Sequence, residues 1–412
     1  MSAGSSEAHL ALSDHGLFAE GPPHELLDEL RSRAPADSGK GPTGTQLWSV
    51  CRHEDIAAIS RDTATFSSWE GGIFPHPDQV NPLDVNRNLL LFKDPPEHTK
   101  YRKILQTAFT PHSVAELEDR VRRVVGETLD AVIEDRSCDF VSAVAVPIPL
   151  RVLSDLMGLP ADDHSRLEDW IERIDAAQIS IEPAAATDVF VEMALYLQEQ
   201  IARQKASGEG SLVMSLVEAE VDGSKLTDEE ILLFFGLLIF AGNDTTRNTM
   251  SGGMLALIEH PDQLELLRAE PERIDSAIEE ILRWTSVVNY FCRTATADAE
   301  VGGCPIAAGE KVVLWYPAGS RDPAVNDDPH SFDIARAEPK HMALGGGGRH
   351  FCLGAGLARL ELRVAFEEIV GRMGDIRPAG RPQRLRSNWA NGLTSLPIEF
   401  TPTVRQGKEP TP

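Results

Sequence analysis

The chain has 412 residues, and its 64 Asp and Glu residues outnumber its 39 Lys and Arg residues, giving a formal net charge of -25 at pH 7. So large an acidic excess disfavours nucleic acid and anionic membrane surfaces as partners. The hydrophobic fraction of 42% and the charged fraction of 25% are those of a globular protein with a sizeable core. Because no interior stretch resembles a linker, we expect one domain over residues 1–412, with disordered tails at about 1–18 and 404–412.

The cysteines and the N-terminus bear on the compartment. There are five cysteines, an odd number with no C-x-x-C pair, namely Cys51, Cys138, Cys292, Cys304 and Cys352. This pattern does not resemble a disulfide framework and favours a reducing compartment. The start of the chain, MSAGSSEAHLALSDHG, lacks the basic and apolar regions of a signal peptide. The most apolar run, residues 231–242, is too short to cross a bilayer. We therefore expect a cytoplasmic protein with no membrane span.

Helical patterns dominate the chain. Apolar residues recur at three and four spacing, which predicts helices at residues 22–34, 114–135 and 164–178. A longer helix is predicted from Asp228 to His260, with Thr227 as N-cap followed by three acidic residues. Strand patterns are short, at residues 46–52, 311–316 and 396–402. The fold class is therefore mainly α with a small β region, and the long helix should cross the domain.

One cysteine has an unusual setting. In residues 341–362, HMALGGGGRHFCLGAGLARLEL, Cys352 follows four glycines and precedes a helical pattern. A helix N-terminus and nearby N–H groups stabilise a thiolate, and Gly345 to Gly348 would let the backbone approach a flat cofactor and donate N–H groups toward the sulfur. Taken alone, a buried structural cysteine beside a flexible loop is the commoner case. The run lacks the Lys-Ser/Thr ending of a phosphate loop, and no second ligand pair indicates zinc.

Three other segments place polar residues where they need an explanation. Residues 241–246, AGNDTT, put Asp244 and Thr245 inside an apolar helix, which by itself indicates a kink or a hydrogen-bonded pair. Glu280 and Arg283 stand at i and i+3 and can pair. In residues 93–109, a helix beginning at Pro95-Pro96 places His98 and Arg102 on one face, where surface charges are the simplest interpretation.

Together these motifs resemble the cytochrome P450 family. The cysteine signature G-x-x-x-H-x-C-x-G followed by L-A-R is matched from Gly346 to Arg359, and A-G-x-D/E-T-T is matched at residues 241–246. The family's E-x-x-R and later Phe-x-x-x-Arg are matched by Glu280 and Arg283 and by Phe332 and Arg336. One departure is Leu344, where the family has an aromatic residue. The resemblance implies a triangular, mainly α domain, with haem between the Asp244 helix and the Cys352 loop.

The resemblance also assigns roles to the residues. Cys352 would be the axial sulfur ligand of the iron in haem b, the metal site, and His350 in the same signature is assigned to cofactor binding. His98, Arg102 and Arg293 would bind the haem propionates, to which guanidinium groups are suited. Gly242 would open the long helix over the iron, Thr245 would donate a hydrogen bond to bound dioxygen, and Asp244 would relay protons.

The implied activity is a monooxygenase that inserts one oxygen atom from O₂ into a C–H bond of a small hydrophobic substrate, resembling actinobacterial sterol, terpenoid and lipid hydroxylases. Four segments are expected to line its pocket, residues 69–74, 237–241, 287–291 and 389–393. Electrons would come from NAD(P)H through a ferredoxin and its reductase, docking on a basic patch that includes Arg349. We expect a monomer. The alternatives are tailoring of a polyketide or peptide natural product, a peroxide-driven fatty-acid hydroxylase and a haem-thiolate gas sensor, the last two having little use for Asp244 and Thr245.

Overall fold

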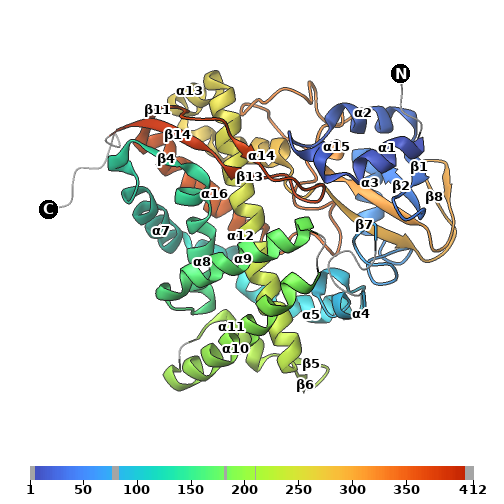
Figure 1. The fold of residues 1–412 in the computed structure, drawn as a ribbon, viewed down its shortest axis with the longest axis horizontal. Helices are drawn as coiled ribbons and strands as arrows, with labels where there is room; N and C mark the ends of the chain where they lie inside the picture. Colours follow the sequence, from blue (N-terminus) through green and yellow to red (C-terminus); the bar gives the residue numbers. More distant parts are fainter. Residues whose placement is uncertain (1–4, 77–82, 181–182, 209, 404–412) are drawn as a thin grey trace.

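The computed structural model describes residues 5–76, 83–180, 183–208 and 210–403 (Figure 1). Helices make up most of it. They are α1 (Ser5–Leu12), α2 (His24–Arg33), α3 (His53–Arg61), α4 (Leu83–Asn86), α5 (Glu97–Gln106), α6 (Pro111–Ala115), α7 (Glu118–Asp130), α8 (Pro147–Met157), α9 (His164–Ser180), α10 (Pro183–Ser207), α11 (Leu212–Glu218), α12 (Asp228–Glu259), α13 (Pro261–Ala269), α14 (Ile274–Thr285), α15 (Tyr316–Ser320) and α16 (Ala355–Arg372). None of the described helices is long and apolar enough to cross a membrane.

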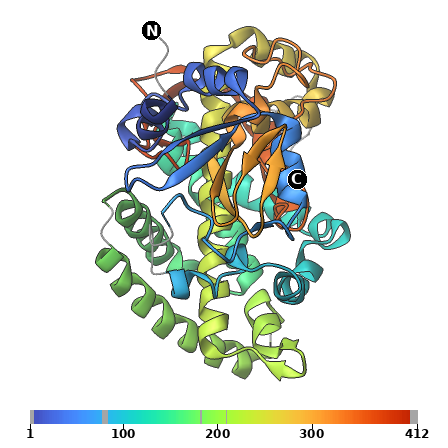
Figure 2. The same ribbon diagram turned by 90° about the vertical axis from the view of Figure 1, so that its right-hand side faces the viewer.

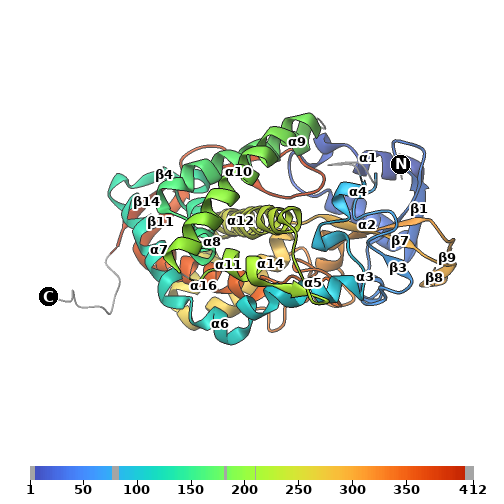
Figure 3. The same ribbon diagram turned by 90° about the horizontal axis from the view of Figure 1, so that it is seen from below.

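The long helix α12 runs through the middle of the molecule, and Figure 3 shows it end-on with helices on several sides. Its start is fixed by a capping box, in which the Thr227 hydroxyl accepts from the Glu230 N–H and the Glu230 carboxylate accepts from the Thr227 N–H. The predicted helix from residue 228 to 260 is confirmed to within one residue. It therefore carries the residues at 241–246 to the centre of the fold.

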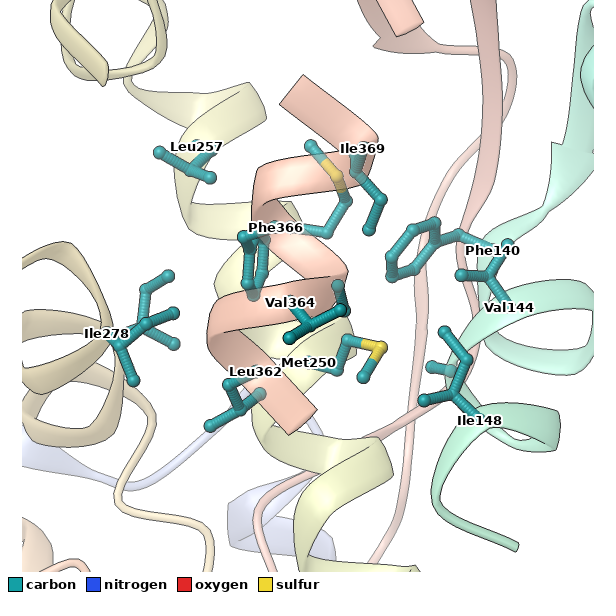
Figure 4. Packing of buried hydrophobic residues seen from close by; sticks show 14 of the residues in the cluster. Phe140, Val144, Ile148, Met250, Leu257, Ile278, Leu362, Val364, Phe366 and Ile369 are labelled. Atoms are coloured by element: carbon teal, nitrogen blue, oxygen red, sulfur yellow. The ribbon is translucent and has the colours of Figure 1, made fainter. Parts of the chain in front are cut away.

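The largest core cluster surrounds the C-terminal half of α12 (Figure 4). Met250 and Leu257 of α12 pack there with Val364 and Phe366 of α16. Gly253 lets the neighbouring helices approach, because a Cβ at that position would lie 2.6 Å from Ile281 Cγ2. This packing holds α16, and with it the segment that contains Cys352, against the central helix.

The β structure lies mainly at one side of the molecule, in front of α12 in Figure 2. Its largest sheet has the strand order β1 (Ala36–Lys40), β2 (Gln46–Val50), β10 (Lys311–Trp315), β7 (Tyr290–Ala295), β3 (Phe66–Ser67). In this sheet Val312 of β10 pairs with Trp48 of the parallel strand β2 and with Arg293 of the antiparallel strand β7. The sheet thus places Arg293 on an interior strand.

The remaining strands form small sheets of two or three strands. They are β4 (Ser137–Asp139), β5 (Glu220–Val221), β6 (Ser224–Lys225), β8 (Ala299–Val301), β9 (Cys304–Ile306), β11 (Met373–Pro378), β12 (Gln383–Arg384), β13 (Leu393–Ser395) and β14 (Pro397–Pro402). The strands predicted at residues 46–52, 311–316 and 396–402 are present as β2, β10 and β14. The mainly α class with a small β region is confirmed.

Two expectations about local structure differ from the model. Residues 5–18, expected in a disordered tail, form α1 and a 3₁₀ turn, and Ala8, Leu12 and Phe18 are buried in a core cluster beside the sheet. Residues 1–4 and 404–412 lie outside the described residues. The single helix expected at residues 114–135 is divided into α6, α7 and a 3₁₀ turn, and α6 begins earlier, at Pro111 after its Thr110 cap.

Candidate functional site

The cysteine segment forms a turn that ends at the start of α16. The Cys352 N–H donates to the Leu344 carbonyl at 3.0 Å, which closes the turn, and the Gly354 backbone N–H donates to the Cys352 sulfur. Burial raises the pKa of the Cys352 thiol, while the Gly354 N–H and the charges of Arg102 and Arg359 act in the opposite direction. The hydrogen bond at the start of α16 thus favours the thiolate, as the sequence predicts, and burial opposes it.

Two of the four glycines pack closely against α3, and the approach of the run to a flat cofactor stays a prediction. A Cβ at Gly346 would lie 2.3 Å from Ser60 Oγ, and one at Gly348 would lie 2.4 Å from the Ser60 carbonyl oxygen. Gly345, Gly347 and Gly348 also have positive φ. The run is thus glycine-rich because it packs against the C-terminal end of α3, and the hydrogen bond to the sulfur comes from Gly354 beyond it.

Basic side chains from three elements converge beside the cysteine. His98 from α5 is buried and its ring centroid lies 4.2 Å from that of His350, whose Nε2 is 3.3 Å from Ser68 Oγ. Arg102, one turn further along α5, donates to the Phe351 carbonyl at 2.7 Å. Burial together with Arg102 and Arg293 lowers the pKa of His98 to about 4 and that of His350 well below its ordinary value. The predicted His98, Arg102, Arg293 and His350 are therefore brought together.

The two arginines of this group lack the carboxylates that arginines elsewhere in the chain have. Among the described residues, no Asp or Glu oxygen lies within 4.0 Å of Arg102 or Arg293. Arg293 is 2% exposed, its Nη1 donates to the Cys292 carbonyl and its Nε has no partner, and His98 Nδ1 also has none. Buried guanidinium groups and N–H donors without acceptors are costly, so this site suits an anionic ligand.

The polar residues of α12 are arranged differently from the expectation. The helix is continuous from Asp228 to Glu259 and is not opened at Gly242. The Thr245 hydroxyl donates to the Ala241 carbonyl of its own helix at 2.8 Å. Asp244 is 2% exposed, and its Oδ1 accepts from Arg247 Nη2 at 2.6 Å and from Asn248 Nδ2 at 3.0 Å. Asp244 and Thr245 are adjacent on α12, yet no hydrogen bond joins their side chains.

The Glu280 and Arg283 pair is confirmed as part of a buried ionic cluster. Both side chains are fully buried, and Arg283 contacts the carboxylate through two hydrogen bonds of 2.7 Å. Arg336 Nε reaches the same carboxylate at 3.2 Å, and Phe332 packs on the ring of Trp284 at 5.5 Å. The cluster joins α14 to the segment that precedes the cysteine loop, a structural role.

Sequence reasoning missed a second ionic cluster next to it. Glu279, adjacent to Glu280, accepts from Arg359 Nε at 2.5 Å and Nη2 at 3.0 Å, and lies 3.1 Å from His341 Nε2. Arg359 belongs to the L-A-R part of the cysteine signature, which was the available signal. The cluster connects α14, α16 and the start of the cysteine loop.

The four segments expected to line a pocket meet around one aromatic ring. The Trp389 ring centroid lies 6.0 to 6.3 Å from those of Phe74, Phe240 and Phe291. Each of the four segments contributes one of these rings. The resulting wall is aromatic and extends along α12 from Phe240 to the exposed Ala241 and Gly242.

Comparison with known proteins agrees with this geometry. The family model described as Cytochrome P450 matches residues 184–374. The "Steroid C26-monooxygenase" of Mycolicibacterium smegmatis is 35% identical over 401 residues, covering 94% of this chain and 93% of the relative. The "Methyl-branched lipid omega-hydroxylase" of Mycobacterium tuberculosis is 38% identical over 369 residues, covering 87% of this chain and 85% of the relative.

The fold comparison gives the same class. A Mycobacterium marinum cytochrome P450 in complex with pseudoionone superposes with a TM-score of 0.86 at 34% identity, covering 93% of this chain and 96% of the other. The chain belongs to the cytochrome P450 family and is a monooxygenase of that family. The family implies a haem, whose propionates would supply the anions that Arg102, Arg293 and His98 lack, so the residues present fit the group.

Proposed function

We propose that Cys352 would hold a haem b through its thiolate and that the chain hydroxylates a C–H bond of a sterol or methyl-branched lipid. The observation that supports the site most directly is the pair of arginines beside the cysteine loop, the buried Arg293 and the half-buried Arg102, which have no carboxylate partner among the described residues. In a chain with 64 acidic and 39 basic residues, partners are plentiful, so unpaired arginines at one place indicate an anionic cofactor. His98, Arg102, Arg293 and His350 would hold its propionate edge.

A haem with a thiolate ligand supplies oxygen activation, since the sulfur donates electron density that favours O–O cleavage. The chain's own residues on α12 would hold and move the protons of the reaction. Thr245, whose hydroxyl donates within the helix, could turn its O–H toward an acceptor above the exposed Ala241 and Gly242. Asp244, the residue before Thr245, would hold and release a proton. Hydrogen bonds from Arg247 and Asn248 would set the orientation of its carboxylate.

The substrate class rests on this cluster of aromatic rings and on the relatives. Trp389, Phe74, Phe240 and Phe291 offer aromatic surface to a bulky apolar molecule. Two similar proteins are a steroid monooxygenase and a methyl-branched lipid hydroxylase, and both names describe such molecules. We expect electrons from NAD(P)H through a ferredoxin and its reductase, acting on a cytoplasmic monomer. The five cysteines, all free, are in keeping with a reducing compartment.

The first experiment is the carbon monoxide difference spectrum of the dithionite-reduced protein, recorded also for Cys352→Ser. We expect a strongly red-shifted Soret band that is lost in the variant. A band at the position typical of histidine ligation would refute the thiolate assignment. A titration with sterols and branched lipids, followed by the spin-state change of the Soret band, then tests the substrate class. Absence of any change with these ligands would contradict the substrate class alone.

A further inference from the structure

The segment that carries Phe74 makes an excursion from the edge of the largest sheet. The short strand β3 runs along the outer side of β7, and the chain returns to β7 at Ile73, whose carbonyl accepts from the Cys292 N–H at 2.8 Å. Between these two points, residues 68–72 form bends rather than a strand. The position of Phe74 therefore depends on the side chains that reach this excursion.

Lys311 of β10 reaches the excursion across β7. It pairs with Thr294 in the sheet register, so the two side chains lie on the same face of the sheet. Its Nζ donates to the Gly71 carbonyl at 2.5 Å and also to the Phe74 carbonyl. Among the described residues, three hydrogen bonds reach backbone atoms of residues 71–74, and Lys311 supplies two of them. Because hydrogen bonds from a charged donor are stronger than neutral ones, these two hold the segment most firmly.

The excursion lies very close to the lysine side chain. A Cβ at Gly71 would lie 2.9 Å from Lys311 Cε and closer still to Thr294 Oγ1, so the absence of a side chain lets the backbone come this near. Lys311 itself is 6% exposed. A lysine buried to this extent loses most of its hydration, and the two carbonyl oxygens replace part of it. The lysine and the segment therefore fix each other in place.

Phe74 connects this attachment to the aromatic cluster. Its ring centroid lies 6.2 Å from that of Trp389, which also contacts Phe240 and Phe291. All four rings are only partly buried, so each has surface that a ligand can cover. Phe240 belongs to α12 and Phe291 to β7, and the Trp389 carbonyl accepts from the Asn289 N–H at 2.8 Å. Phe74 is therefore the ring of the cluster whose position depends on Lys311.

We propose that Lys311 is a specificity-determining residue that positions Phe74 against the substrate through the backbone of residues 71–74. The inference rests on the proposed function, since it takes the aromatic cluster as a contact of the sterol or methyl-branched lipid. A rigid ring system needs its contact surface in a fixed place, whereas a flexible chain adjusts to a displaced ring. Loss of the attachment therefore weakens the binding of a sterol more than the binding of an unbranched fatty acid.

The test compares Lys311→Met, which removes the ammonium group from a side chain of similar length, with Lys311→Arg, which keeps the charge and the donors. Lys40→Met is the matched control, because Lys40 is an exposed lysine of β1 in the same sheet. Dissociation constants for cholesterol and for hexadecanoic acid are measured from the spin-state change of the Soret band. Hydrogen exchange of peptides covering residues 66–76 reports how well the segment is held. The carbon monoxide band and the affinity for imidazole show that the haem site is intact.

We expect Lys311→Met to weaken cholesterol binding about tenfold and hexadecanoic acid binding only about twofold, because a segment that must be ordered on binding reduces the affinity for a rigid ligand. Hydrogen exchange in residues 66–76 should become faster. Lys311→Arg should recover most of the affinity, and Lys40→Met should match the wild type. Gly71→Ala, which displaces the segment while Lys311 is intact, should give the same change in selectivity, so the test does not depend on one variant folding.

A double-mutant cycle with Phe74→Leu determines whether Lys311 acts through Phe74. The loss of cholesterol affinity in the double variant should be smaller than the product of the two single losses. Independent losses, or equal losses for the two ligands, would overturn the inference. If the wild type binds cholesterol and Lys311→Met binds it as tightly, only this inference is wrong. If the wild type binds neither sterols nor branched lipids, the proposed substrate class fails, and the inference fails with it.

Discussion

Glu279→Gln should destabilise the protein because Glu279 connects α14, α16 and the cysteine loop. Burial opposes ionisation of this carboxyl, but hydrogen bonds from Arg359 and His341 outweigh it and lower the pKa from 4.5 to about 2. At 1.36 kcal/mol per pH unit, this difference corresponds to at most about 3 kcal/mol of folding free energy at pH 7. The carboxylate is 30% exposed, so solvent screening reduces that value somewhat.

The pH dependence follows from the lowered pKa. The stabilisation is fully present above pH 4.5 and is lost as the pH falls toward 2, since both folded and unfolded states then bind the proton. Urea unfolding of the wild type and Glu279→Gln should therefore differ by about 2 to 3 kcal/mol at pH 7 and by only about 1 kcal/mol at pH 3. Glu338→Gln, which removes a surface pair with Lys340, is the control and should change little. An equal difference between wild type and Glu279→Gln at both pH values would refute the reasoning.

Three further predictions concern other parts of the site. Burial raises the pKa of Glu361 to about 8, so between pH 4.5 and 8 this carboxyl is ionised in the unfolded chain but protonated in the folded chain. Glu361→Gln should therefore stabilise the protein by up to about 3 kcal/mol at pH 7 and should give no gain below pH 4.5, as measured by urea unfolding. Gly348→Ala should lower the melting temperature, since φ is 74° and the new Cβ would meet the Ser60 carbonyl at 2.4 Å; Gly126→Ala, with nothing within 4 Å, should not. Reduction by ferredoxin should slow as salt is added, and Arg349→Glu should weaken this dependence; a rate indifferent to ionic strength would exclude a basic docking patch.

The sequence predicted those features of the fold that are encoded locally. The long helix follows from its capping residues and its apolar run, and the Glu280–Arg283 pair follows from i, i+3 spacing. The pairing of Asp244 with Arg247 and Asn248, at i+3 and i+4, could have been predicted by the same rule. The packing of the glycine run on α3 could not, because Gly346 and Ser60 are far apart in the chain and a glycine pattern does not indicate what it packs against.

The positions of the individual charges explain why the resemblance to the family predicted the cofactor-binding residues while the composition did not. A net charge of -25 excludes partners for the surface as a whole but does not reveal where cations are left without carboxylates. In the structure, Arg283 and Arg359 are paired with Glu280 and Glu279, and these pairs hold the frame of the site. Arg102 and Arg293 are held instead by backbone carbonyls, which fix their positions without neutralising them. An arginine that contacts a carboxylate therefore stabilises the fold, whereas an arginine that contacts only a backbone carbonyl is available to an anionic ligand. Tertiary contacts decide between the two cases.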